Sequence, residues 1–203
     1  MKECETYSRA REMLAKAGLR DDTIKQLERD FHYFDAPASK GHHLSVRGGL
    51  ARHSVNVTER LVDLTQSLGV GWPRAESPYL VGMLHDLVKC RCYRAVTGTE
   101  QDKTPKWEYV QPLYGGHGAA SVMLAMSDLG VFLYPPEAAA IRWHMGAFCL
   151  AGDELKEYDR ALDEWPLELI AAHSADMLAA RVDETNRLNA VQPSGLATQS
   201  HQD

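Results

Sequence analysis

The sequence has no long apolar run, which excludes a membrane-spanning helix. No stretch approaches the roughly 20 apolar residues that such a helix needs. The first residues, MKECETYSRAREML, are charged throughout and lack the apolar core of a signal peptide. We therefore expect a cytoplasmic protein with no membrane partner.

Cysteine is scarce and basic charge is in deficit. The four cysteines form no Cys-x-x-Cys pair, so we expect free thiols in a reducing compartment. Lys and Arg number 22 against 28 Asp and Glu, which gives a formal net charge of −6. Such a chain does not attract the backbone of long nucleic acid. A small phosphorylated substrate remains compatible, because a bound metal supplies positive charge locally.

The length and composition are those of a folded globular domain. The chain has 203 residues, of which 44% are hydrophobic and 25% charged. This length suits one domain and is short for two. We expect a single domain over 1–185, including N-terminal helices within 1–34, and a flexible polar tail over 186–203. No internal repeat is present.

Helical spacing of apolar residues predicts an all-α fold. The expected helices cover 5–17, 22–33, 50–68, 77–88, 117–129, 136–145 and 164–183. The Pro- and Gly-bounded stretch 35–49 is expected to be a loop. YRAV and KWEYV have β-like composition and flank the polar GTEQDKTP, which predicts a small inserted β-hairpin within 91–114.

The pair His85-Asp86 interrupts PYLVGMLHDLVKC, which is otherwise apolar enough to be buried. Burying a carboxylate and an imidazole is costly unless they are paired or bind a cation. Imidazole nitrogen and carboxylate oxygen together suit Mn, Fe, Co, Ni or Zn. A salt bridge from this pair to Lys89 at a helix end is the alternative interpretation.

Other predicted elements each carry one side chain that can bind a metal. They are His53, His117, His144 and Asp176. Taken alone, each histidine also fits a packed structural role, and the aspartate also fits a solvent-facing position. Successive elements are 27 to 33 residues apart, which is one helix plus one connection. That spacing lets helix ends converge on one point in a bundle, and so predicts a metal site.

The order His53, His85-Asp86, His117, His144, Asp176 resembles the HD-domain superfamily of metal-dependent phosphohydrolases. HDLVK at 85–89 matches its signature, including a lysine three residues after the aspartate. APASKGHHLSVRGGLARHS at 36–54 is similar to a segment of the HD module of bacterial 3′-to-5′ exoribonucleases and of HD-like modules in some conjugative relaxases. The resemblance covers roughly residues 30–180.

The resemblance implies an HD-domain helical bundle with two bound transition metals. It assigns the first metal to His53, His85, Asp86 and Asp176. Asp86 would bridge to a second metal held by His117 and His144. One-metal members often lack the two middle histidines, so their presence favours a binuclear site.

The implied activity is hydrolysis of a nucleotide or short oligonucleotide by a metal-activated hydroxide. Asp86 and Lys89 would be catalytic, with Lys89 neutralising a phosphate oxygen. A surface lysine at a helix end is the alternative for Lys89. Arg47 and the neighbouring His43 lie in a glycine-bounded loop and are candidate substrate contacts, Arg47 because its fork matches phosphate geometry. For His43 a merely exposed loop is the alternative.

Two missing features narrow the activity. No GYP motif follows the HD pair, which argues against a cyclic-dinucleotide phosphodiesterase of the HD-GYP kind. No β-rich nucleic-acid-binding domain precedes residue 30, so we do not expect processive RNA degradation.

Two functions from other classes remain open. One is a di-iron HD-type oxygenase, which uses the same ligand set. The other is a non-catalytic regulatory module stabilised by metal. Six candidate ligands argue against the second, because structural sites are usually closed by four.

Overall fold

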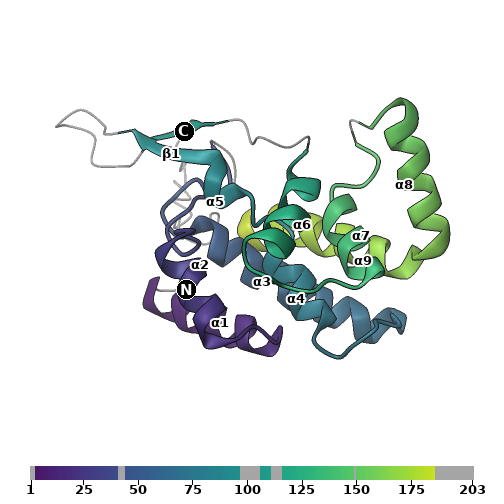
Figure 1. Ribbon diagram of the computed structural model, residues 1–203, viewed down its shortest axis with the longest axis horizontal. Coiled ribbons are helices and arrows are strands. Elements are labelled where there is room, and N and C mark those ends of the chain that lie inside the picture. Colours follow the sequence, from purple (N-terminus) through teal and green to yellow (C-terminus); the bar gives the residue numbers. More distant parts are fainter. Residues whose placement is uncertain (1–2, 41–43, 97–105, 111–115, 149, 186–203) are drawn as a thin grey trace, which may run out of the picture.

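The fold is helical, with one small β-hairpin at its edge (Figure 1). The computed structural model describes residues 3–40, 44–96, 106–110, 116–148 and 150–185. This confirms the predicted all-α class with an inserted hairpin. In those ranges no helix is both long and apolar enough to cross a membrane.

The predicted helices are present in the expected order, and two further ones, α5 and α8, were not predicted. In chain order, the helices are α1 Glu3–Lys16, α2 Asp21–Arg29, α3 Gly49–Leu68, α4 Ser77–Leu84, α5 Lys89–Cys92, α6 His117–Ser127, α7 Pro135–Trp143, α8 Gly152–Glu164 and α9 Pro166–Leu178, followed by the π-helix η1 Ala179–Asp183. The strands β1 Tyr93–Val96 and β2 Lys106–Tyr109 pair antiparallel, with Tyr93 opposite Tyr109 and Ala95 opposite Trp107.

Helices α3 and α4 form the centre of the molecule (Figure 1). α3 packs against α1, α4 and α9, and α4 also contacts α1 and α7. Every residue of α4 except Tyr79 is buried, as expected for a helix that is apolar on all sides. A polar group placed at the end of such a helix is therefore held in the protein interior.

The helix predicted over 77–88 is shorter than expected. α4 ends at Leu84, and the backbone then continues through tight turns in which the N–H of Leu87 bonds to Leu84 and that of Lys89 bonds to Asp86. The sequence remains apolar as far as Val88, so hydrophobicity gives no sign of this change. As a result, His85 and Asp86 lie at the end of the helix and beyond it.

Helix α8 was not predicted. None of its residues is fully buried, but Tyr158, Ala161 and Leu162 pack half-buried against a small cluster that includes Trp143 and Leu169. It stands at one side of the molecule, against α9 (Figure 1). The predicted tail over 186–203 and the polar GTEQDKTP segment lie outside the described residues.

Candidate metal centre

All six predicted ligand residues sit at or near helix ends. His53 lies near the start of α3, His85 caps the end of α4, Asp86 follows it, His117 begins α6, His144 caps the end of α7, and Asp176 lies in the last turn of α9. The structure brings these six side chains together.

Glycines allow the helices to approach closely enough. A Cβ at Gly82 in α4 would lie 2.7 Å from the Cα of Thr58 in α3. A Cβ at Gly118 in α6 would lie 2.2 Å from the backbone oxygen of Arg142 in α7. Real side chains do not fit at these separations, so only glycine permits these two contacts. The first brings α3 against α4, and the second brings the start of α6 against the end of α7.

An inner group forms around His53 and His85. Their Nε2 atoms are 3.3 Å apart. Asp86 Oδ2 lies 3.3 Å from His85 Nε2 and 3.7 Å from His53 Nε2. Asp176 joins from α9, with Oδ1 3.1 Å from His53 Nε2. We call these four residues the inner group.

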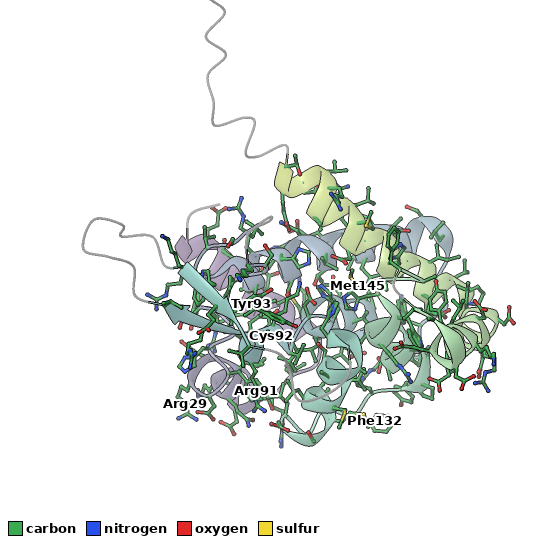
Figure 2. All side chains as sticks on the ribbon, turned by 90° about the horizontal axis from the view of Figure 1, so that it is seen from above. Arg29, Arg91, Cys92, Tyr93, Phe132 and Met145 are labelled. Carbon is green, nitrogen blue, oxygen red and sulfur yellow. The ribbon has the colours of Figure 1, made fainter. Side chains whose placement is uncertain are left out.

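An outer group forms on the other side of the same carboxylate. Asp86 Oδ1 lies 3.7 Å from the Nε2 atoms of both His117 and His144, which are 3.2 Å from each other. We call these three residues the outer group. Met145, which follows His144, lies near the middle of the molecule in Figure 2, whereas Phe132 projects at its periphery.

Both groups fit a metal ion. Donor atoms about 2.1 Å from a tetrahedral metal lie roughly 3.4 Å from one another, which matches these separations. Asp86 Oδ1 is buried and makes no hydrogen bond within the described ranges. A buried carboxylate oxygen without a donor is costly, and a cation would satisfy it. The buried His and Asp donors can therefore hold a metal ion.

Hydrogen bonds orient the imidazoles toward the centre. The Nδ1 atom of His85 lies 2.8 Å from the carbonyl oxygen of Gly82. In the same way, the Nδ1 atom of His144 lies 2.7 Å from the carbonyl oxygen of Ile141. Each Nδ1 therefore carries the proton and donates it to the carbonyl. This leaves the Nε2 lone pair facing the other donors, which is the tautomer that a metal ligand needs.

Glu184 is a buried residue of the site that sequence reasoning missed. It follows the π-helix η1, and its Oε1 lies 2.9 Å from His53 Nδ1 and accepts a hydrogen bond from the amide of Asn56 at 3.1 Å. A carboxylate behind a ligating histidine fixes the ring and raises its basicity. The polar sequence around Glu184 gave no signal, because there it resembles a solvent-facing residue near a helix end.

The two groups differ in protonation. Burial disfavours a charge on His53, but hydrogen bonds to Asp176 and Glu184 outweigh it and raise its pKa to about 9. Burial instead lowers the pKa of His144 to about 3, with His85 adding to the effect. Burial also lowers the pKa of His117. At neutral pH, His53 is thus protonated in the absence of metal, while the two outer histidines are neutral.

Lys89 reaches the same carboxylate. Its Nζ lies 2.5 Å from Asp86 Oδ2, and its side chain is 18% exposed. Burial opposes ionisation of both partners, yet their mutual attraction raises the pKa of Lys89 and, with His85, lowers that of Asp86. The salt bridge considered as an alternative to a metal site therefore exists, and it exists beside the histidine cluster.

The predicted substrate contacts lie elsewhere or outside the described residues. Arg47 is exposed and pairs with Asp35 at 2.7 Å, on the rim of a cavity next to the hairpin. His43 lies outside the described residues, as does His42. His173, three residues before Asp176, donates from Nδ1 to the backbone oxygen of His144 at 2.7 Å and so ties α9 to the end of α7.

Comparisons with protein families, with characterised proteins and with solved structures find no match for this chain. The site is therefore interpreted from its own geometry. That geometry is a helical fold with a buried His/Asp centre that could bind metal.

Proposed function

We propose that this protein is an HD-type, metal-dependent phosphohydrolase or phosphodiesterase that acts on a nucleotide or short oligonucleotide. The observation that carries the proposal is the position of Asp86. Its Oδ2 belongs to the inner group with His53 and His85, and its Oδ1 belongs to the outer group with His117 and His144. A carboxylate with one oxygen in each group is suited to bridge two metals, as the resemblance to the HD superfamily also implies.

Divalent ions bound in such a pair of sites supply an activated water and positive charge for in-line displacement at phosphorus. The chain itself supplies rigid positioning. The carbonyls of Gly82 and Ile141 fix two imidazole rings, and Glu184 fixes a third. Burial of His53, His85, Asp86 and His144 keeps bulk water from most of the donors, so charges act strongly on a bound phosphate.

Lys89 supplies the chain's own positive charge at this centre. Its ammonium group is held on Asp86 yet remains partly exposed, so a substrate phosphate can reach it. A cation fixed before the reaction stabilises the negative charge that develops on phosphate oxygens. The chain's net charge of −6 favours a small substrate over long nucleic acid.

A substrate screen tests the proposal. Purified protein loaded with Mn should hydrolyse at least one substrate among nucleotides, short oligonucleotides and generic phosphodiesters. Oxygen-dependent turnover by the iron-loaded protein would instead support the di-iron oxygenase. Bound metal with no turnover of any substrate would support the non-catalytic module.

Replacing Lys89 tests its role separately from the metal. We predict that Lys89→Ala lowers turnover by about a hundred- to a thousandfold, the usual cost of losing a donor that stabilises the transition state. Metal content should stay unchanged, because Lys89 is not one of the proposed metal ligands. Lys156→Ala is the matched control, since Lys156 is an exposed lysine on α8 that pairs only with Asp153 in the described contacts. Full activity of Lys89→Ala would show that the lysine only balances the charge of Asp86.

A further inference from the structure

A cavity of about 570 Å³ opens beside the hairpin, and its lining includes Cys90, the residue that follows Lys89 in the chain. The hairpin lines it through Tyr93, Ala95 and Trp107. The polar residues of its lining are His32, Asp35 and Arg47. This volume lies within the range of pockets that bind small ligands.

The hairpin presents different chemistry on its two faces. Tyr93 and Ala95 lie opposite Tyr109 and Trp107, so these four side chains share one face, which carries the aromatic rings. Arg94 and Glu108 share the other face and form an ion pair at 2.6 Å. The aromatic face is the one that lines the cavity.

Trp107 carries a donor that the protein leaves unused. Its indole Nε1 is buried and has no hydrogen-bond partner in the part of the chain that the structure describes. Buried indole N–H groups usually find an acceptor. A planar ligand with ring nitrogens or carbonyl oxygens can offer that acceptor while it stacks on the aromatic rings.

Tyr93 is the cavity residue whose environment includes the charges of the metal centre. It is the first residue of β1, directly after the short helix α5 that begins at Lys89, and Figure 2 shows it with Cys92 at the base of the hairpin. Burial raises the pKa of Tyr93, and the nearby Lys89 ammonium partly opposes this. The charges of Lys89 and Asp86 thus act on a residue that lines the cavity.

We propose that this cavity binds the base of a nucleotide whose phosphate lies at the metal centre. The aromatic rings of Tyr93 and Trp107 provide the stacking surface, and the indole N–H of Trp107 provides one hydrogen bond to the edge of the base. The proposal rests on the phosphohydrolase function for the phosphate, but the base subsite can be tested by binding alone.

Isothermal titration of the metal-loaded protein with three probes tests this subsite. The probes are adenosine 5′-monophosphate, ribose 5-phosphate, which lacks the base, and adenosine, which lacks the phosphate. We expect the monophosphate to bind about tenfold or more tightly than ribose 5-phosphate, the effect of stacking one base on an aromatic ring. Equal affinities would overturn the proposal.

Variants of the two hairpin faces sharpen the test. Trp107→Leu should weaken the binding of the monophosphate and of adenosine by about tenfold and leave the binding of ribose 5-phosphate unchanged. Trp107→Phe keeps the ring without the donor and should retain part of the preference. Arg94→Ala, on the opposite face of the same hairpin, should behave as wild type. Equal losses for all three probes in Trp107→Leu, or a loss in Arg94→Ala as large as in Trp107→Leu, would show a structural effect and contradict the subsite.

Failure of the subsite and failure of the enzyme are distinguishable. Trp107-dependent binding of adenosine without turnover of any phosphoester would support the base subsite and count against the hydrolase. Phosphoester turnover with no preference for the base would support the hydrolase and overturn the subsite.

Discussion

The inner and outer groups share Asp86 but sit in different surroundings. The inner group is enclosed: His53 is 1% exposed, and the carboxylates of Asp176 and Glu184 contact its two ring nitrogens. The outer group has two neutral imidazoles and one carboxylate oxygen, and the side chain of His117 is 33% exposed. One half of the centre is thus rich in negative charge and closed, and the other is less charged and open.

This difference assigns different tasks to the two groups. More carboxylates favour tighter binding of a dication, so the inner group is suited to hold a metal permanently. Three protein donors and a partly exposed side leave positions for water and substrate, which is the pattern of catalytic sites. A substrate should therefore approach from the side of His117.

The largest effect is expected from the residue that the groups share. Asp86→Asn keeps the side-chain volume but leaves one ligating oxygen in place of two and removes the charge. We predict loss of metal from both groups and loss of hydrolysis, while helical content is retained because the other ligands lie on separately packed helices. Elemental analysis and far-UV circular dichroism measure the two outcomes. Asp128→Asn, at an exposed ion pair with Arg91, is the control. Unchanged metal content in Asp86→Asn would refute the shared centre.

A selective loss is expected at the open side. His117→Ala removes one outer donor at a third-exposed position, so its effect on folding should be small. We predict that about one metal per chain is lost and that the inner metal remains. If the protein is the proposed hydrolase with the open site as its reactive side, turnover should fall at least about a hundredfold. Metal titration with activity assays on the same samples checks this. Loss of both metals would show that the two groups do not bind independently.

The sequence predicted the parts of the site that depend on pattern. His85-Asp86 was visible because two ionisable residues interrupt an apolar run, and His117 and His144 because each lies at a predicted helix end. The helices themselves followed from apolar periodicity, since most pack one face on the core. α8 was missed although Leu155, Tyr158 and Leu162 recur at helical spacing, because these few apolar residues stand among charged ones and none is fully buried.

The remaining features depend on contacts that a linear pattern does not contain. Glu184 reaches His53 across 131 positions of the chain, and nothing near it in the sequence marks it as buried. The tight turns after Leu84 separate Asp86 from α4 although hydrophobicity continues through Val88. The cavity needs the hairpin, the loop before α3 and Cys90 to meet, which only the folded chain defines.

A smaller effect, confined to the inner group, is expected from Glu184. Glu184→Gln keeps the hydrogen bond to His53 geometrically possible but removes the charge that raises its basicity. We predict that the inner group binds metal ten- to hundredfold more weakly, as is typical for losing a carboxylate behind a ligating histidine. The affinity of the outer group for metal should stay unchanged. Competition with a chromophoric chelator measures both affinities.

Glu137→Gln is the matched control for Glu184→Gln. Glu137 is also fully buried, but its partners are Arg74 and Ser77. It should lower stability without changing metal affinity. Equal weakening of the inner metal in both variants would show that Glu184 acts through stability alone.

The smallest effect is a difference in pH dependence between the groups. The pKa of His53 is raised from 6.5 to about 9, so at pH 7 a metal entering the inner group must displace its proton. Inner affinity should therefore fall by about tenfold for each pH unit below 9. Burial lowers the pKa values of His117 and His144 below 6.5, so outer affinity should be nearly constant between pH 7 and 9. Calorimetry in buffers of different ionisation enthalpy should show close to one proton released per inner metal at pH 7 and none for the outer metal.

The same proton has the opposite effect on the stability of the metal-free protein. Because the folded pKa of His53 lies above its unfolded value, its contribution to stability is complete below pH 6.5 and is lost as the pH rises through about 9. Denaturant unfolding of chelator-treated protein should thus show stability falling between pH 6.5 and 9, over the range in which inner metal affinity rises. Glu184→Gln removes one carboxylate that raises this pKa. The pH range over which stability falls and the pH range over which inner metal affinity rises should therefore both shift to lower pH. If only one of these two pH dependences shifts, the proton and the metal do not compete for the same nitrogen of His53.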